Sequence, residues 1–222
     1  MATPKSTRIA IVIIAIMMVV GTIGSFAVIV LAEQNKDIDN QRYEEAVAQW
    51  QRDQEIYNAK QAAQADQLSD KHFETFDQFT DRVASYDKDS ITELKKTDLK
   101  QGDGEEIDGE TKFATYYIVW NSDGKVFDGS VVDDSKLKAP LRVDDGLDQA
   151  SFIDGWIEGM KGMKIGGVRE LVVPSDLAYG EAGSGDNVPP NMPLKFIVMV
   201  IELPEEIEEP EMPEALMRSI YG

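Results

Sequence analysis

The chain of 222 residues contains no cysteine and only one histidine, His72. The lack of cysteine excludes disulfides, thiolate catalysis and zinc sites with cysteine ligands. A single histidine excludes a multi-histidine metal site, and its position excludes a Ser/His/Asp triad in the C-terminal half. Because His72 stands among charged neighbours, we predict that it is an exposed helix residue. Any chemistry in this chain must therefore proceed without thiol groups and without several imidazoles.

Basic residues are scarce as well. The chain has 22 Lys and Arg against 41 Asp and Glu, which gives a formal net charge of -19. Nucleic-acid binding needs a positively charged stripe, so we expect no nucleic-acid partner. The length suits one ordinary globular domain with additional segments.

Residues 9–32 carry no charge for 24 residues. As a helix this run is about 36 Å long at about 1.5 Å per residue, enough to cross a hydrocarbon core of about 30 Å. Lys5 and Arg8 precede the run, so the positive-inside rule places the N-terminus in the cytoplasm and the rest outside, as in a single-pass protein of the cell membrane. A cleaved signal peptide with a secreted product is the alternative, because Val30 and Ala32 fit a processing site; the length of the run favours a retained anchor.

Residues 33–89 contain 14 acidic and 7 basic residues and neither Pro nor Gly. Two apolar stripes at helical spacing predict two amphipathic helices, interrupted near residues 61–69 where no stripe continues. The heptads are too few to specify a coiled coil, which leaves open both a monomeric spacer and a weak homodimer through this stalk. The first stripe consists of Tyr43, Val47, Trp50 and Tyr57.

After residue 89 the pattern changes to short strands and turns. Residues 113–120, 168–173 and 194–203 are rich in β-branched, aromatic and aliphatic residues, as strands are. Residues 152–160 read as a short helix with Ser151 as its N-cap. Several strands with one short helix predict an α+β domain with the helix packed on one face of the sheet.

The last of these strands is apolar on both faces. Phe196, Val198 and Val200 share one face, while Ile197 and Met199 begin an equally apolar second face. A half-buried antiparallel strand normally alternates with polar residues, so both faces should be covered. Our hypothesis is that the stalk helices or a second copy of the chain cover the outer face.

Five sequence runs, taken in their order and spacing, resemble the FKBP-type peptidyl-prolyl cis/trans isomerases over about residues 91–203. A single run of this kind has low specificity, whereas the ordered set is highly specific. The runs are GDG at 102–104, DGKVFDGS at 123–130, FIDGWIEGMKGMKIGG at 152–167, RELVVPSDLAYGEAG at 169–183 and VPPNMPLKFIVMVIEL at 188–203.

The resemblance implies a half-open antiparallel sheet wrapped around the short helix, with an apolar pocket for a prolyl ring. It implies that Trp156 forms the pocket floor, that the Tyr179 hydroxyl and the Ile153 N–H donate to substrate carbonyls, and that Asp128 lies beside the twisting amide. Leu141 stands where the family typically has an aromatic residue, after an insertion at residues 131–138. The implied catalytic residues are Tyr117, Phe127, Asp128, Ile153, Trp156, Tyr179 and Phe196, and the implied substrate-binding residues are Leu141, Phe152 and Val188.

The activity that the resemblance implies is isomerisation of X-Pro bonds in proline-containing polypeptides, which would assist the folding of exported or surface proteins. Neither a cofactor nor a metal is implied. The alternative function is a non-catalytic module that binds proline-containing peptides, or a holdase chaperone.

The expected organisation has four parts. Residues 1–32 form a cytoplasmic tip and transmembrane anchor, residues 33–89 the acidic helical stalk, and residues 90–203 the isomerase domain. Residues 204–222 hold six Glu and three Pro. Such a composition favours a disordered tail, with at most a brief helix near residues 215–220.

Overall fold

The computed structural model describes the backbone of residues 5–133 and 135–221, and the side chains from residue 39 onward except at 134, 219, 221 and 222. The chain divides into two compact units, one of Met1–Tyr57 with Glu208–Gly222 and one of Asn58–Ile207. The second unit contains the domain expected at residues 90–203 together with the end of the preceding helix. That helix end therefore belongs to the folded domain.

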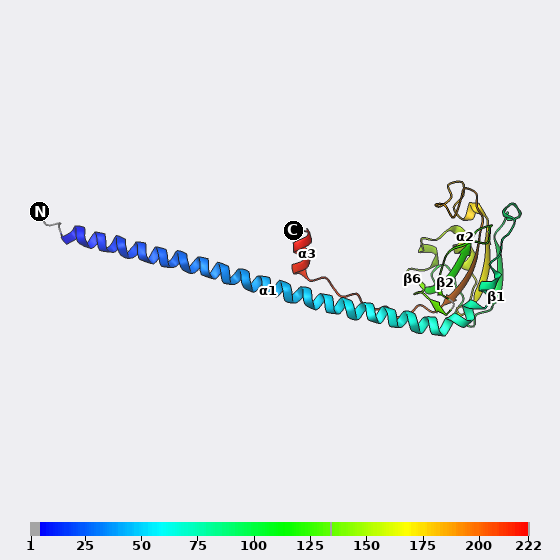
Figure 1. Ribbon diagram of the computed structural model, residues 1–222, viewed down its shortest axis with the longest axis horizontal. Coiled ribbons are helices and arrows are strands. Elements are labelled where there is room, and N and C mark those ends of the chain that lie inside the picture. Colours follow the sequence, from blue (N-terminus) through cyan, green and yellow to red (C-terminus); the bar gives the residue numbers. More distant parts are fainter. Residues whose placement is uncertain (1–4, 134, 222) are drawn as a thin grey trace. The chain divides into compact units, whose positions relative to one another are not determined.

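Helix α1 (Lys5–Asp77) is continuous over 73 residues (Figure 1). It passes through residues 61–69, so the predicted interruption there is wrong. Ala and Leu in this stretch are strong helix formers, and no Gly or Pro is present to end the helix. The lack of an apolar stripe in these residues leaves the helix without a continuous apolar face for packing here, but its backbone hydrogen bonds continue.

Where the structure describes side chains, none of the helices combines the length and the apolar character that a bilayer span requires. The predicted span at residues 9–32 lies outside these described residues. In the tail, residues 202–213 form neither helix nor strand, and helix α3 (Glu214–Tyr221) covers the stretch where a brief helix was predicted.

The main sheet is antiparallel, with strand order β1-β7-β8-β2-β3 and with β6 pairing the other half of β2. Two of the predicted strands, β2 and β7, have the predicted bounds, and β8 ends at Ile201 instead of residue 203. The strands are β1 (Lys95–Lys100), β2 (Phe113–Trp120), β3 (Val126–Gly129), β6 (Leu141–Val143), β7 (Val168–Val173) and β8 (Leu194–Ile201), with β4 (Val131–Asp133) and β5 (Lys136–Leu137) in a separate hairpin. The short helices are α2 (Asp154–Met160) and the 3-10 turns η1 (Thr80–Arg82), η2 (Lys88–Ser90), η3 (Leu147–Gln149) and η4 (Ser175–Leu177).

Helix α2 packs on the inner face of the sheet, against β7 (Figure 1). Two glycines permit the close approach: a Cβ on Gly155 would collide with Val173, and one on Gly159 would lie 2.7 Å from Leu171 Cδ1. The N-cap is Ile153, which makes no side-chain cap hydrogen bond, so the prediction that Ser151 caps the helix is wrong. Residues 152 and 153 precede the helix, which leaves the Ser151 hydroxyl outside its first turn.

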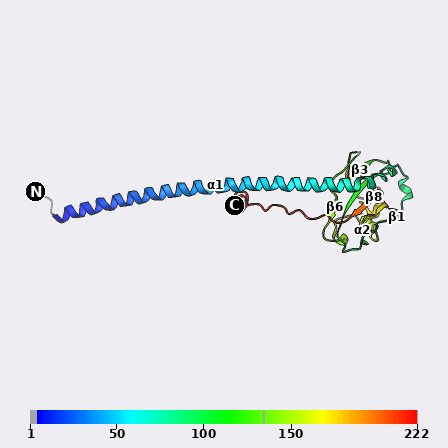
Figure 2. The same ribbon diagram turned by 90° about the horizontal axis from the view of Figure 1, so that it is seen from below.

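The outer face of the sheet is covered by the end of α1 and the segment that follows it. In both views the last turns of α1 run alongside the sheet (Figures 1 and 2). Phe76 is fully buried there, the Trp120 indole N–H donates to Ala84 O at 3.0 Å, and the Tyr86 hydroxyl donates to Pro193 O at 2.7 Å. The hypothesis that the stalk packs on this face is confirmed. The buried sheet residues of this outer cluster are Ala114, Tyr116, Ile118, Trp120, Val168, Ile197, Met199 and Ile201.

His72 lies in the same contact and is half-buried, so its prediction as an exposed residue is wrong. Its ring centroid lies 6.1 Å from that of Tyr116. Burial, followed by the charges of Lys71 and Lys100, lowers the pKa of His72 to about 4. The charged neighbours of His72 in the sequence gave no sign of this contact, because its partner Tyr116 lies on β2, 44 positions later in the chain.

Candidate active site

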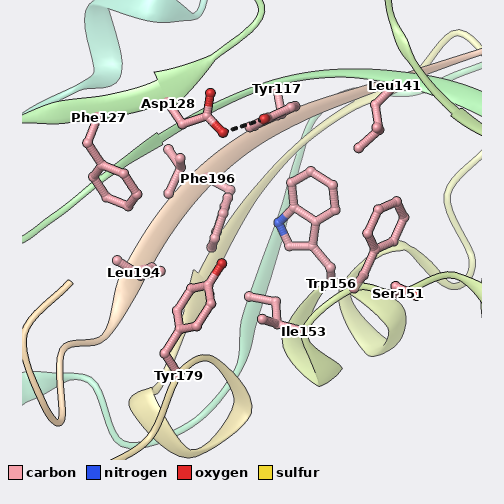
Figure 3. A pocket seen from close by; sticks show the side chains of 12 residues that line it. Tyr117, Phe127, Asp128, Leu141, Ser151, Ile153, Trp156, Tyr179, Leu194 and Phe196 are labelled. Atoms are coloured by element: carbon pink, nitrogen blue, oxygen red, sulfur yellow. Dashed lines mark hydrogen bonds between the residues drawn. The ribbon is translucent and has the colours of Figure 1, made fainter. Parts of the chain in front are cut away.

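A pocket of about 360 Å³ opens between β2, β3, β8 and α2. Figure 3 shows aromatic side chains entering it from opposite sides, Tyr117 and Phe196 from the sheet and Trp156 from the helix. Its walls are therefore mainly apolar, as is typical of small-molecule and peptide sites. The lining residues are Tyr117, Val119, Phe127, Asp128, Leu141, Ser151, Phe152, Ile153, Trp156, Tyr179, Leu194 and Phe196.

Trp156 is 5% exposed and lies at the centre of an aromatic cluster. Its ring meets those of Phe152, Tyr117 and Phe196 edge to face, with centroids 5.0, 5.1 and 5.5 Å apart. Edge-to-face pairs at these separations are favourable beyond the area that they bury. The indole is therefore held rigidly as one wall of the pocket.

Arg169 on β7 holds the end of the helix that carries Trp156. Its Nη1 donates to Gly159 O at 2.7 Å and to Lys161 O at 3.2 Å, and its Nε donates to Asp98 Oδ1 at 2.6 Å. The last carbonyls of a helix lack intrahelical partners, and a cation placed there also complements the helix dipole. Arg169 is 6% exposed. Sequence reasoning missed it, because nothing local to β7 indicates the helix end that it binds.

Tyr117 and Asp128 form the polar edge of the pocket. The Tyr117 hydroxyl donates to Asp128 Oδ2 at 2.6 Å (Figure 3). Burial raises the pKa of Tyr117, and this hydrogen bond and the carboxylate charge raise it further. Burial acts to raise the pKa of Asp128 too, but hydrogen bonds from Tyr117 and the Gly129 N–H, with the charge of Lys138, outweigh it and lower that pKa. Asp128 is thus a carboxylate at neutral pH, fixed on one side by the phenol.

Three donors at the pocket have no acceptor within the described residues. The Tyr179 hydroxyl points into the pocket and its residue is 43% exposed (Figure 3). The Ile153 N–H precedes the first turn of α2 and makes no bond inside the protein. The Trp156 Nε1–H is buried and unpaired. The cost of an unpaired buried donor, about 1–3 kcal/mol, therefore applies to Trp156, whereas Tyr179 and Ile153 offer donors that a substrate carbonyl could accept from.

Nine of the ten residues predicted for the site line this one pocket. The exception is Val188, which is 2% exposed and belongs to the inner core cluster. Its side chain therefore offers almost no surface to a substrate. Sequence reasoning missed Val119, Ser151 and Leu194 as lining residues. Val119 and Leu194 had a signal, since they share the inner face of their strands with predicted residues.

Leu141 is 39% exposed at the pocket rim. It follows a hairpin, β4 and β5, which occupies the insertion expected at residues 131–138. Among the side chains that the structure describes, no cluster of His, Asp and Glu is arranged to hold a metal ion.

Known proteins resemble this chain over the domain that was expected at residues 90–203. Residues 93–201 match the family model described as FKBP-type peptidyl-prolyl cis-trans isomerase. The FK506-binding protein of Neisseria meningitidis serogroup A / serotype 4A is 36% identical over 108 residues, which cover 49% of this chain and 94% of that protein. The peptidyl-prolyl cis-trans isomerase Mip of Chlamydia trachomatis serovar D is 36% identical over 121 residues, covering 52% of this chain and 45% of that protein. The crystal structure of FkpA from Escherichia coli aligns with 66% of this chain and 63% of its own, at 32% identity and a TM-score of 0.43.

An antiparallel sheet with a short helix on its inner face and an aromatic pocket between them is the fold of this class of isomerase. The chain belongs to the FKBP-type peptidyl-prolyl cis-trans isomerase family, and it is an enzyme of that type. Its substrates are accordingly proline-containing polypeptides. The predictions of fold and activity made from the five sequence runs are confirmed, while the roles of individual site residues stay predictions.

Proposed function

We propose that this pocket isomerises X-Pro bonds of exported or surface polypeptides by binding the twisted amide more tightly than either planar form. Rotation about an X-Pro bond faces a barrier of about 18–20 kcal/mol, because amide resonance must be broken. No proton transfer and no nucleophile is needed. A site without cysteine or histidine is therefore adequate for this reaction.

The twisted amide has lost its resonance and carries less separated charge than the planar amide. A dry apolar pocket therefore penalises the ground state more than the transition state, which is differential binding. A difference of about 5–7 kcal/mol corresponds to about four to five decades in rate. The single observation that carries the proposal is an aromatic pocket with three unpaired donors at its wall.

The side chains divide into walls and polar groups. Trp156 forms the floor, and Phe127 and Phe196 form apolar walls, for the prolyl ring. The Tyr179 hydroxyl and the Ile153 N–H lie free to donate to the carbonyls that flank the rotating bond. We assign to Asp128 the position beside the twisting amide, where the Tyr117 hydrogen bond fixes its carboxylate at 2.6 Å.

The test is a protease-coupled isomerisation assay of the full-length chain on a Phe-Pro peptide. The double variant Phe127→Ala, Asp128→Ala should lower kcat/KM by about tenfold or more, since a pocket wall and the fixed charge are both lost. Both residues are partly exposed, so the folded state should persist by circular dichroism. Unchanged turnover in the double variant contradicts the site assignment. A wild-type chain that suppresses aggregation of an unfolded client without any turnover is a holdase instead.

We propose further that residues 9–32 anchor the chain in a membrane with the isomerase domain on the extracytoplasmic side. The support is the 24-residue uncharged run after Lys5 and Arg8. This location brings the pocket to polypeptides that fold after export. A cleaved signal peptide would instead release the domain as a secreted protein.

A weak homodimer through the stalk is a second proposal about assembly. Its support is the spacing of Val47 and Trp50 within the first stripe, which places them on one side of α1. Analytical ultracentrifugation of the full-length chain in detergent should measure a dissociation constant for the dimer. This constant should rise in the double variant Val47→Ser, Trp50→Gln. A monomer at every protein concentration rejects this proposal.

A further inference from the structure

The hairpin of β4 and β5 joins the end of α1 to the polar edge of the pocket. On the helix side, the Leu137 N–H donates to Ser69 Oγ at 2.9 Å, and both residues are buried, at 0% and 2% exposed. One residue earlier, Lys136 Nζ lies 2.7 Å from Asp66 Oδ1. The hairpin end is therefore fixed to α1 by a buried hydrogen bond, an ion pair and the packing of Leu137 in the outer cluster.

The next residue, Lys138, reaches the Tyr117–Asp128 pair at the polar edge of the pocket. Its backbone N–H donates to Ser130 O at 2.9 Å. Its Nζ lies 3.6 Å from Asp128 Oδ1 and 5.8 Å from the centroid of the Tyr117 ring. The Ser130 N–H in turn donates to Tyr117 O, and Ser130 Oγ accepts from the Tyr117 N–H. One short segment thus contacts α1 at Leu137 and the Tyr117–Asp128 pair at Lys138.

We propose that Ser69 and Asp66 of α1 are positioning residues for the isomerase site. By holding Leu137 and Lys136, they keep the Lys138 ammonium beside Asp128. A lysine side chain is flexible, and charge–charge energy depends on distance, so the ammonium acts on the carboxylate only if its backbone is fixed. The helix is then part of the catalytic architecture as well as a spacer. This inference rests on the proposed role of Asp128 and Tyr117.

The first experiment measures kcat and KM of the full-length chain carrying Ser69→Ala. Loss of this hydroxyl removes one of the three contacts that fix the hairpin end. It should lower kcat about threefold to tenfold with KM within about twofold, the effect expected from one lost hydrogen bond. Ser69→Thr keeps the hydroxyl and should restore most of the rate. Asp66→Lys alone and Lys136→Asp alone should each lower kcat. The double variant, in which the two charges are exchanged, should likewise recover that loss.

A double-mutant cycle that combines Ser69→Ala with Lys138→Gln distinguishes a positioning role of Ser69 from a role in stability alone. If Ser69 acts through Lys138, the two substitutions together should reduce kcat no more than Lys138→Gln alone, since coupled residues are not additive. The matched control is Val83→Ala, which lies in the segment after α1 and packs against the outer cluster. It should lower the denaturation midpoint and leave kcat unchanged at temperatures where the chain is folded.

Two results overturn the inference: a kcat that Ser69→Ala leaves unchanged, or additive losses in the cycle with Lys138→Gln. Failure of the proposed site is a different outcome. There, Asp128→Asn alone would leave the rate unchanged, whatever the Ser69 variants do. The rate with Asp128→Asn is therefore measured first.

Discussion

At the scale of single residues, the pocket combines groups that are satisfied inside the protein with groups that are not. Tyr117 and Asp128 bind each other, and Arg169 binds the end of α2. Tyr179 and the Ile153 N–H bind nothing within the described residues. Groups without internal partners contribute little to the folded state, so their presence at the pocket is best explained by the substrate.

Tyr179→Phe tests this distinction. The hydroxyl has no partner in the described part of the protein and its residue is 43% exposed, so the free energy of unfolding should change by less than about 0.5 kcal/mol. If the hydroxyl donates to a substrate carbonyl, kcat/KM should fall about threefold to tenfold. Denaturant titration and the coupled peptide assay measure the two quantities. An unchanged kcat/KM would remove Tyr179 from the set of donors.

At the scale of elements, the sheet is covered on both faces, and the two covers come from different parts of the chain. Helix α2 covers the inner face, and the end of α1 with residues 78–90 covers the outer one. The double-faced apolar pattern of β8 predicted the second cover. It did not predict that Ser69 and His72, both polar, would be part of it.

A truncation series checks the outer cover. A chain beginning at residue 58 keeps Phe76 and should be monomeric and stable. A chain beginning at residue 90 loses this fully buried ring and should be less stable by at least about 3–5 kcal/mol, the usual loss for an emptied aromatic site. Light scattering should show association of the shorter fragment through its exposed apolar face. Two fragments of equal stability, both monomeric, would contradict the proposed contact.

The contact also predicts how stability depends on pH. Because burial lowers the pKa of His72 from 6.5 to about 4, the folded chain excludes a proton that the unfolded chain binds. The contribution of His72 is complete above pH 6.5 and is lost as pH falls toward 4. Because the ring is partly exposed, we expect the free energy of unfolding to fall by only about 1–2 kcal/mol from this group over that pH range.

The measurement compares urea midpoints at pH 7 and pH 4.5 for the wild type and His72→Gln. Glutamine does not titrate, so the variant should lose less stability between the two pH values. Carboxyl groups elsewhere titrate in both proteins and cancel in the difference. Equal losses would mean that His72 does not sense this change.

The features that the sequence predicted depend on residues close together in the chain, and most of those it missed depend on residues far apart in the chain. Strands β2 and β7 were predicted with their bounds because an enrichment in β-branched, aromatic and aliphatic residues is a local signal. Local patterns said nothing of Arg169, whose partners Gly159 and Lys161 lie across a turn. The resemblance to the ordered family motifs predicted ten site residues, and nine of them line the pocket, because motifs carry long-range geometry that periodicity lacks. The tenth, Val188, is buried in the inner core instead.

At the scale of the whole molecule, the N-terminal sequence bears on where this enzyme acts. An uncharged run of 24 residues, preceded by Lys5 and Arg8, precedes an acidic helix and the isomerase domain. The anchor proposal places the pocket outside the cytoplasm, where newly exported chains must settle their X-Pro bonds. Uncatalysed isomerisation takes tens to hundreds of seconds, so a tethered isomerase would shorten a step that limits folding.

The anchor is tested by reconstituting the full-length chain in phospholipid vesicles and washing them at alkaline pH. A spanning helix should stay with the lipid. Val20→Arg places a charge near the centre of the run, at a cost of about 2.5–3.5 kcal/mol for insertion, and should increase the fraction released, whereas the matched control Val20→Leu should behave like the wild type. Complete release of the wild-type chain would contradict the anchor. A mature chain that begins at Glu33 in cells would establish the cleaved signal peptide and a secreted isomerase.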